Sequence, residues 1–255
     1  MKTGIWLSLT LVLLWPLNSY ASEALDEELA ELVEIFSSHT LVAQSKSVGT
    51  RVRFSGVTDD ALFDLVEENI EDFYQQASGR DEIQYVSWMV QMLAFSGNKK
   101  YSGTLSDIAL NAKSPKIRRH ASRSLEVLPK YSKWNPVISK GLEEVPKYAL
   151  PRARMLNMLA AEDPELVRAG ASVAFHHFSA DKEAMDFVEK RLLELYPLAS
   201  AGGGNDEYGE ASAWLCKVLG NTGNSDYLPT LEKIAAETKA PAVKRHSKKA
   251  IRKLK

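Results

Sequence analysis

The sequence predicts an all-α protein in which antiparallel helix pairs stack into a solenoid. Three observations predict this class: an internal repeat at an offset of 126 residues, apolar residues at helical spacing, and glycine or proline at the ends of short segments. At 255 residues and 45% hydrophobic composition, the chain is long enough to bury a large core. Its single cysteine, Cys216, excludes an intramolecular disulfide framework.

Residues 1–21 have the three parts of a secretory signal peptide. Lys2 precedes an apolar run from Ile5 to Trp15, and Ser19-Tyr20-Ala21 fits a small-x-small cleavage site. The run is shorter than the roughly 20 residues that span a bilayer. We therefore expect cleavage near Ala21 and a periplasmic or secreted chain without a transmembrane anchor; a retained anchor is the alternative.

Residues 22–57 are predicted to form an N-terminal helix followed by an irregular segment. The helical pattern covers residues 23–38, whereas residues 39–57 have none. Val52, Phe54 and Val57 nearly alternate there, which favours an extended strap laid over the first repeats. The remaining residues, 58–255, are predicted to form one repeat domain.

The internal repeat aligns residues 88–128 with residues 214–254 without a gap. Of the 41 aligned positions, 14 are identical, and they include the pair Trp88 and Trp214. In each copy a first helix ends at glycine, Gly97 or Gly223. A second helix follows, and a proline, Pro115 or Pro241, then begins a third. Such single-striped helices are too small to bury their apolar faces alone and become stable by stacking.

These motifs resemble the HEAT repeat. The residues that carry the resemblance are Leu105-x-x-Ile108-Ala109 and then Pro115-x-Ile117-Arg118-x-x-Ala121, within 85–131 and again within 211–255. A weaker match lies at residues 166–171. In that family, antiparallel helix pairs of about 40 residues stack into a curved solenoid, and 126 is three times 42. The resemblance implies a HEAT-like α-α superhelix of about five helix pairs, and it identifies an architecture rather than a function.

Other helices are predicted near 59–77, 133–146, 150–161, 163–178, 182–197 and 207–219. Between the two matched copies the number of helices is odd, which does not fit clean pairs, so we expect one irregular repeat there. The glycine-rich segment Ala201–Asp206 is expected to be a loop that interrupts the array.

Charge is unevenly distributed along the chain, although the formal net charge is only −1. Residues 22–77 carry 13 acids and three bases, whereas residues 239–255 carry eight bases and no acid. The net charge argues against a nucleic-acid binder. The charged ends are explained by the polar outer faces that terminal repeats need and by the dipole of the last helix. Alternatives are an anionic partner at the basic end, head-to-tail self-association, or binding of the last helix to an anionic membrane surface.

The resemblance also implies a candidate binding surface, because in HEAT-like arrays the second helix of each pair lines the concave side. Here that helix would carry a basic track, whose members are Arg118, Arg119, His120, Arg123, Lys244, Arg245, His246 and Lys248. On a helical wheel His120 borders the buried stripe, so packing between repeats is the alternative. Trp88 and Trp214 are expected in the core, with exposed aromatic anchors for a partner as the alternative.

Catalytic motifs are absent: the sequence has no His-Glu-x-x-His, Gly-x-Ser-x-Gly, phosphate-binding loop or Cys-x-x-Cys. His176 and His177 are adjacent, and neighbouring residues of a helix point about 100° apart, which disfavours shared metal binding. Asp181 and Glu183 could complete such a site, which makes an enzyme or a metal or small-ligand binder the alternative. We therefore expect a non-catalytic scaffold without a cofactor. Its concave surface is expected to bind a protein segment, and this segment would be acidic if the basic track binds it.

Overall fold

The computed structural model describes residues 19–37, 45–199 and 206–255, and within them the chain forms helices and no strand. The predicted signal peptide lies outside the described residues except for Ser19–Ala21, which begin the first helix, and the predicted loop at 201–206 lies outside them except for Asp206. The α-helices are α1 (Ser19–Ser37), α2 (Ser45–Arg53), α3 (Asp60–Phe73), α4 (Arg80–Phe95), α5 (Ser102–Asn111), α6 (Pro115–Ile138), α7 (Leu150–Ala160), α8 (Pro164–His177), α9 (Lys182–Leu195), α10 (Glu207–Leu219), α11 (Leu228–Glu237) and α12 (Pro241–Leu254). Short 3-10 helices are η1 (Lys99–Tyr101), η2 (Lys147–Ala149), η3 (Tyr196–Leu198) and η4 (Ser225–Tyr227).

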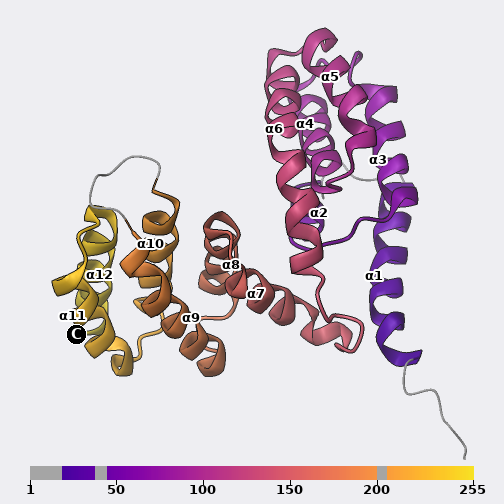
Figure 1. The fold of residues 1–255 in the computed structure, drawn as a ribbon. Helices are drawn as coiled ribbons and strands as arrows, with labels where there is room; N and C mark the ends of the chain where they lie inside the picture. Colours follow the sequence, from indigo (N-terminus) through magenta and orange to yellow (C-terminus); the bar gives the residue numbers. More distant parts are fainter. Residues whose placement is uncertain (1–18, 38–44, 200–205) are drawn as a thin grey trace, which may run out of the picture.

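The helices pack in neighbouring pairs, which confirms the all-α class. From α3 onward each odd-numbered helix packs against the even-numbered helix that follows it (Figure 1). The even-numbered helices also pack against one another, α4 on α6, α8 on α10 and α10 on α12. Among the described helices, none is long and apolar enough to cross a membrane.

The 126-residue repeat is also a repeat of structure. At this offset η1 and α5 correspond residue for residue to η4 and α11. Gly97 and Gly223 both have positive φ, at 68° and 70°, and so end the helix in the left-handed conformation that glycine tolerates. Asn98 and Asn224 then cap the following turn by accepting a backbone N–H two residues on.

The odd number of helices between the copies is compatible with regular pairing. Each copy begins on the second helix of a pair, α4 or α10, so clean pairing leaves an odd number of helices, α7, α8 and α9, between α6 and α10. α2 packs on α4 as α8 packs on α10, but α6 does not pack on α8 in this way, so the array is less regular between the copies.

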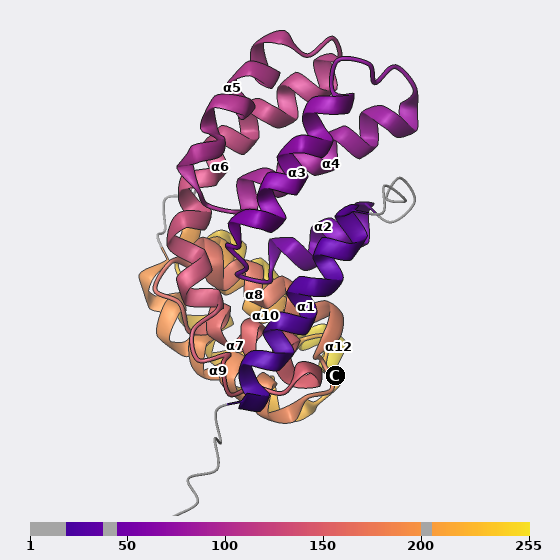
Figure 2. The same cartoon turned by 90° about the vertical axis from the view of Figure 1, so that its right-hand side faces the viewer.

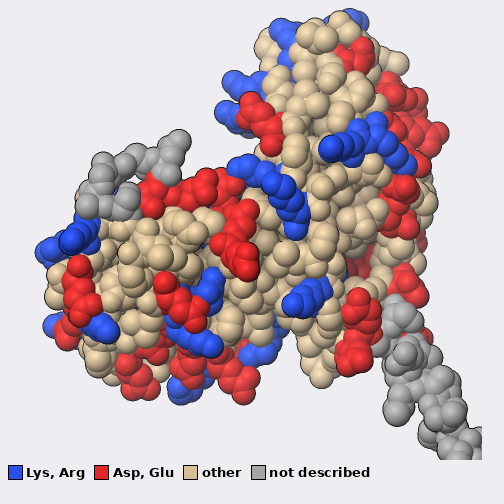
Figure 3. Space-filling view, in the orientation of Figure 1, with Lys and Arg blue, Asp and Glu red and all other residues tan. Residues whose placement is uncertain are grey.

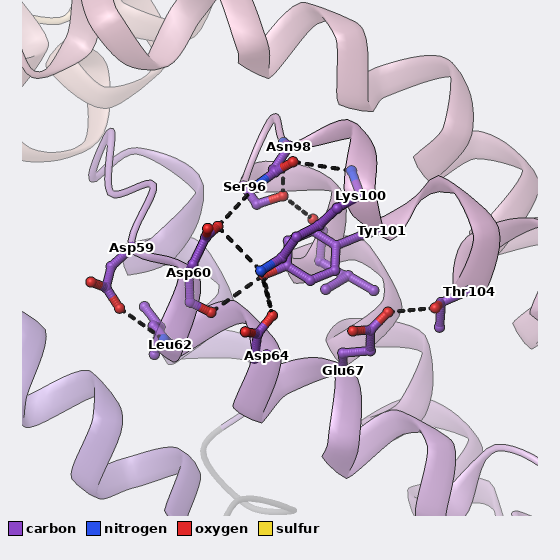
Figure 4. A network of polar contacts seen from close by, with 11 residues as sticks. Asp59, Asp60, Leu62, Asp64, Glu67, Ser96, Asn98, Lys100, Tyr101 and Thr104 are labelled. Carbon is purple, nitrogen blue, oxygen red and sulfur yellow. Dashed lines mark hydrogen bonds and ion pairs between the residues drawn. The ribbon is translucent and has the colours of Figure 1, made fainter.

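Polar contacts of the same kind join adjacent helix pairs in both halves. The hydroxyl of buried Tyr101 donates to Asp64 Oδ1 at 2.8 Å, and Lys100 Nζ lies 2.7 Å from the same carboxylate (Figure 4). In the second copy the Tyr227 hydroxyl donates to Asp186 at 2.9 Å. Burial and the neighbouring carboxylate raise the pKa of both tyrosines. Both hydroxyls therefore stay protonated and act as structural donors.

Two large apolar clusters form most of the core, and a small third one packs Ala24 of α1 against Leu142 and Leu150. The first is built from α1 to α6 and ends at Tyr131, and the second begins at Ile138 and extends to α12. Trp134, near the end of α6, packs against both. The molecule therefore has two halves, and α6 leads from one to the other (Figure 1).

Residues 45–53 correct the prediction of an extended strap, because they form α2. Val48 and Val52 are both buried and lie four residues apart, which places them on one face of a helix. Phe54 and Val57 follow the helix end, and Gly56 turns the chain there with φ of 71°. The nearly alternating residues Val52, Phe54 and Val57 therefore belong to the last turn of α2 and to the turn that follows it. Residues 38–44 lie outside the described residues.

Residues 133–146 correct a second prediction, because residues 133–138 continue α6 and residues 139–146 form turns instead of a helix. The α6 helix runs unbroken through Pro129 and Pro136, both of which are exposed. Its buried face continues instead through Tyr131, Asn135 and Ile138. The Asn135 amide donates to the carbonyls of the last turn of α4, at Phe95 (2.9 Å) and Ser96 (3.1 Å), and so satisfies acceptors that a helix end leaves free.

The acidic N-terminal helix is tied to the middle of the chain by ion pairs. α1 passes beside α2 and reaches toward α7 (Figure 2). Arg154 on α7 binds buried Glu28 with two hydrogen bonds, at 3.0 and 2.5 Å. Lys147 contacts Glu27 and Glu31, at 3.0 and 2.6 Å. Part of the acidic charge at the N-terminal end is thus matched within the chain itself.

Candidate functional site

The principal candidate site is a groove between the two halves of the molecule. Its volume is about 480 Å³, within the range of roughly 300–1,000 Å³ that is usual for ligand sites. Figure 3 shows the surface hollowed between the halves, with basic side chains along the edge formed by α6 and acidic ones along the facing edge. Its walls come from α2, α4 and α6 of one half and α8 and α10 of the other, and the lining residues are Thr50, Arg53, Phe54, Trp88, Gln91, Ala94, Phe95, His120, Arg123, Ser124, Val127, Lys130, Tyr131, Trp134, Glu165, Arg168, Ala169, Ser172 and Trp214.

A row of aromatic rings crosses the junction of the halves. The ring centroids of Phe95 and Tyr131 are 4.7 Å apart, and those of Tyr131 and Trp134 are 5.3 Å apart. The Trp134 indole N–H donates to Asp163 Oδ2, the N-cap of α8, at 2.7 Å. Trp134 is thereby fixed between the two cores and forms a rigid part of the groove.

Trp88 and Trp214 line the same groove and are half-buried, so neither is the fully enclosed core residue that the sequence led us to expect. Trp88 packs over Gly49, where an added Cβ would lie 3.1 Å from the indole ring. Trp214 packs against the Phe175 ring, and Lys217 Nζ lies 3.8 Å from its ring centroid. Both indoles therefore have packing contacts within the protein, and each leaves part of its surface exposed at the groove.

Most of the charge on the lining is positive. Arg53 donates to the Tyr131 hydroxyl at 3.3 Å and lies over the Phe54 ring. Among the described residues that line the groove, Glu165 is the one acid, and it forms an ion pair with Lys130. Arg168 pairs at 2.9 Å with Glu210 outside the lining. The carboxylates of Glu165 and Glu210 are therefore each paired with a base of the lining.

Two basic side chains of the lining, His120 and Arg123, have no hydrogen-bond or ion-pair partner within the described part of the chain. They lie about one turn apart on α6. Burial lowers the pKa of His120, and the nearby charges of Lys116, Arg119 and Arg123 lower it further. Because those neighbouring charges are all positive, this part of the wall has a positive potential that the protein itself does not neutralise.

The groove includes two members of the predicted basic track, His120 and Arg123. Arg118 instead donates to the carbonyls of Ala112 (2.6 Å) and Lys113 (3.1 Å) at the end of α5. Arg119 is exposed away from the lining. The four members on α12 also lie outside it: three are exposed and His246 is half-buried, and these are Lys244, Arg245, His246 and Lys248.

The alternative site at His176 and His177 is not assembled as a metal centre. Both histidines are exposed at the end of α8, with ring centroids 6.2 Å apart. Asp181 caps α9 and pairs with Arg152 at 2.6 Å, which lowers the pKa of Asp181. Within the described ranges, no group of three or more His, Cys, Asp or Glu residues could hold a metal ion.

The apolar side of the basic C-terminal helix, α12, is packed inside the protein. Val243, Ser247 and Ala250 of α12 are buried, and α12 packs against α10 and α11. The exposed bases of α12 remain available for electrostatic contacts, but its buried residues are not free to enter a lipid surface.

Sequence reasoning missed Arg53, Trp134 and Arg168 as members of the groove. Trp134 was assigned to a separate helix after a break, and Arg53 to a strap. The aromatic residues within these segments were the available signal, but only the course of α2 and α6 brings them to one surface.

A scan against models of known protein families finds no match, and a search of curated proteins finds no relative.

Proposed function

We propose that this chain is an exported, HEAT-like α-solenoid that acts as a non-catalytic scaffold and binds a protein segment in the groove between its halves. The carrying observation is that Trp88 and Trp214, equivalent residues of the two repeat copies, line one cavity together with unpaired basic side chains. Tryptophan and arginine are the residue types that most often dominate the energy of protein interfaces. Rigid helices would hold these anchors in place before a partner arrives.

The solenoid architecture is supported by the paired helices and by the recurrence of the same turns at an offset of 126 residues. It is also supported by similar polar contacts of Tyr101 and Tyr227 in the two halves and by the packing of even-numbered helices on one another within each half. These features are typical of HEAT-like arrays, in which the inner helices of successive pairs line a concave surface. The groove is lined by even-numbered helices in the same way. Export is supported by the apolar run and small-x-small site of residues 5–21.

Position-specific photo-crosslinking in the native compartment tests this function. A photoreactive residue would replace Val127 or Ser172, which line the groove from different halves, and in a control it would replace Leu110, which is 78% exposed on α5. We expect both groove positions to capture the same protein and Leu110 to capture none of it. Equal capture at Leu110, or no protein captured at either groove position, would contradict the proposal.

A further inference from the structure

We propose that the segment held in the groove is acidic and extended, an inference that deepens the proposed function and rests on it. A carboxylate of the segment lies against Arg123 and His120. An apolar or aromatic side chain of the same segment lies against Trp88 and Trp214.

The hydrogen-bonding character of the lining points to an anionic occupant. Guanidinium, ammonium and indole groups donate hydrogen bonds and accept none. The carboxylate of the lining, Glu165, is already paired with Lys130, whereas the Arg123 guanidinium has no partner within the described residues. A ligand must therefore supply acceptors to match an excess of donors. A carboxylate supplies acceptors and the compensating charge together.

The unpaired bases mark where that carboxylate is bound. Arg123 has a planar fork of donors that suits bidentate binding of a carboxylate. His120, about one turn away on the same helix, gains a hydrogen-bond partner when an anion arrives, because its charged neighbours are the bases Lys116, Arg119 and Arg123. Arg53 and Arg168 lie on other walls of the groove but already have protein partners. The α6 wall therefore offers the strongest unmatched positive potential of the site.

The tryptophans favour a peptide over a carbohydrate. Trp88 and Trp214 provide broad apolar faces that can clamp a side chain from both halves. The unpaired Arg123 side chain matches the charge of a carboxylate, which a neutral carbohydrate lacks. A flat membrane surface does not enter a recess between two halves. An extended peptide advances about 3.3 Å per residue, so a few residues place an acidic and an apolar side chain in a cavity of this size.

The test is selection from a phage-displayed library of random peptides about ten residues long, carried out on the full chain and in parallel on the double variant R123Q/W214L. Selected peptides are then synthesised, and their dissociation constants are measured by fluorescence anisotropy. Each is compared with a partner peptide in which Gln or Asn replaces every Glu or Asp. Circular dichroism and thermal unfolding confirm that each variant is folded.

We expect selection on the unmodified chain to enrich Asp or Glu together with an apolar or aromatic residue, and the amide peptides to bind about tenfold more weakly. R123Q should weaken binding of the acidic peptide by about tenfold but leave the amide peptide nearly unchanged. The matched control is R119Q, which removes an exposed arginine of the same helix outside the lining and should change binding less than about twofold.

If acidic and amide peptides bind equally and R123Q has no effect, the acidic partner is wrong while peptide binding in the groove stands. If no peptide is enriched over the double variant, the groove does not bind protein segments, and the proposed function falls with the inference. Enrichment of basic peptides would overturn the inference that the segment is acidic, but not the proposed function.

Discussion

Trp88 and Trp214 are 126 residues apart, occupy equivalent positions in the two repeat copies, and line one cavity. In each copy the tryptophan lies on the second helix of a pair, α4 or α10. A duplicated core position would give two separate buried sites. Here the arrangement of the halves instead turns a repeated residue toward a shared groove, and this explains why an aromatic ring is found on both walls.

Gly97 and Gly223 occupy equivalent positions in the two copies, so substitutions there allow a matched comparison of stability. Both have positive φ, but a Cβ at Gly97 would lie 2.5 Å from the backbone nitrogen of Ser132, whereas nothing lies within 4 Å of one at Gly223. G223A should cost about 1–2 kcal/mol for the left-handed conformation alone. G97A should cost about 3 kcal/mol or more, because α6 must also move. Urea unfolding of both variants measures the difference, and equal losses would show that α4 and α6 are not in close contact at Gly97.

Removing one partner of the buried ion pair between Glu28 and Arg154 should destabilise the protein more than replacing both partners with apolar residues. R154M leaves a buried carboxylate without its partner and should lower the free energy of unfolding by about 3–5 kcal/mol. The double variant E28L/R154M should recover most of that loss, since both charges are gone. Denaturant unfolding of E28L, R154M and the double variant gives the coupling free energy between the two residues. Additive losses would mean that α1 does not dock on α7 through this pair.

The thiol of Cys216 should be inert in the folded protein. It is buried, and burial raises its pKa to about 12, so about one molecule in ten thousand carries the thiolate near pH 8. A thiol reagent should therefore react only as fast as α10 unfolds. A cysteine placed at exposed Ser225 in a C216A background serves as the fast-reacting control. Equally rapid labelling of Cys216 in the native chain would contradict its burial.

Stability should fall as the pH drops through the titration of the two repeat histidines. Burial lowers the pKa of His120 and His246 below 6.5, and nearby bases lower it further. The unfolded chain then binds more protons than the folded chain between the folded pKa and about 6.5. This contribution to stability is therefore complete above about pH 6.5 and is lost as the pH falls through the folded pKa.

The variants H120Q and H246Q test that linkage. Each should reduce the slope of unfolding free energy against pH between about pH 7 and about pH 5, and the double variant should reduce it most. Thermal or urea unfolding across this range supplies the measurement. If the slope of unfolding free energy against pH is the same in the double variant as in the wild type, the fold does not disfavour the charged form of either imidazole.

Local patterns predicted much of the fold, because most helices combine an apolar stripe with a capping or breaking residue at their ends. Gly97 and Gly223 marked the helix ends, and the repeat placed α5 and α11 correctly. The pattern failed at α2, whose short buried face is only Val48 and Val52, and at α6, which continues through exposed Pro129 and Pro136 where a separate helix was expected. In both places tertiary packing decided the outcome.

The site was harder to predict because it depends on how the two halves lie relative to each other. His120 and Arg123 could be singled out from the repeat, and both line the groove. The equivalent helix α12 carries a similar row of bases, yet its residues lie outside the lining. Nothing in a single helix reveals which copy faces the other half.

The affinity of the captured partner, or of a selected peptide, for W88L, W214L and the double variant tests most directly the claim that the groove is one binding site. Each single variant should weaken binding by about tenfold or more, and the double variant should show a loss that is not the sum of the two, because both rings touch one ligand. Wild-type affinity in all three variants, with each one folded, would show that binding takes place elsewhere.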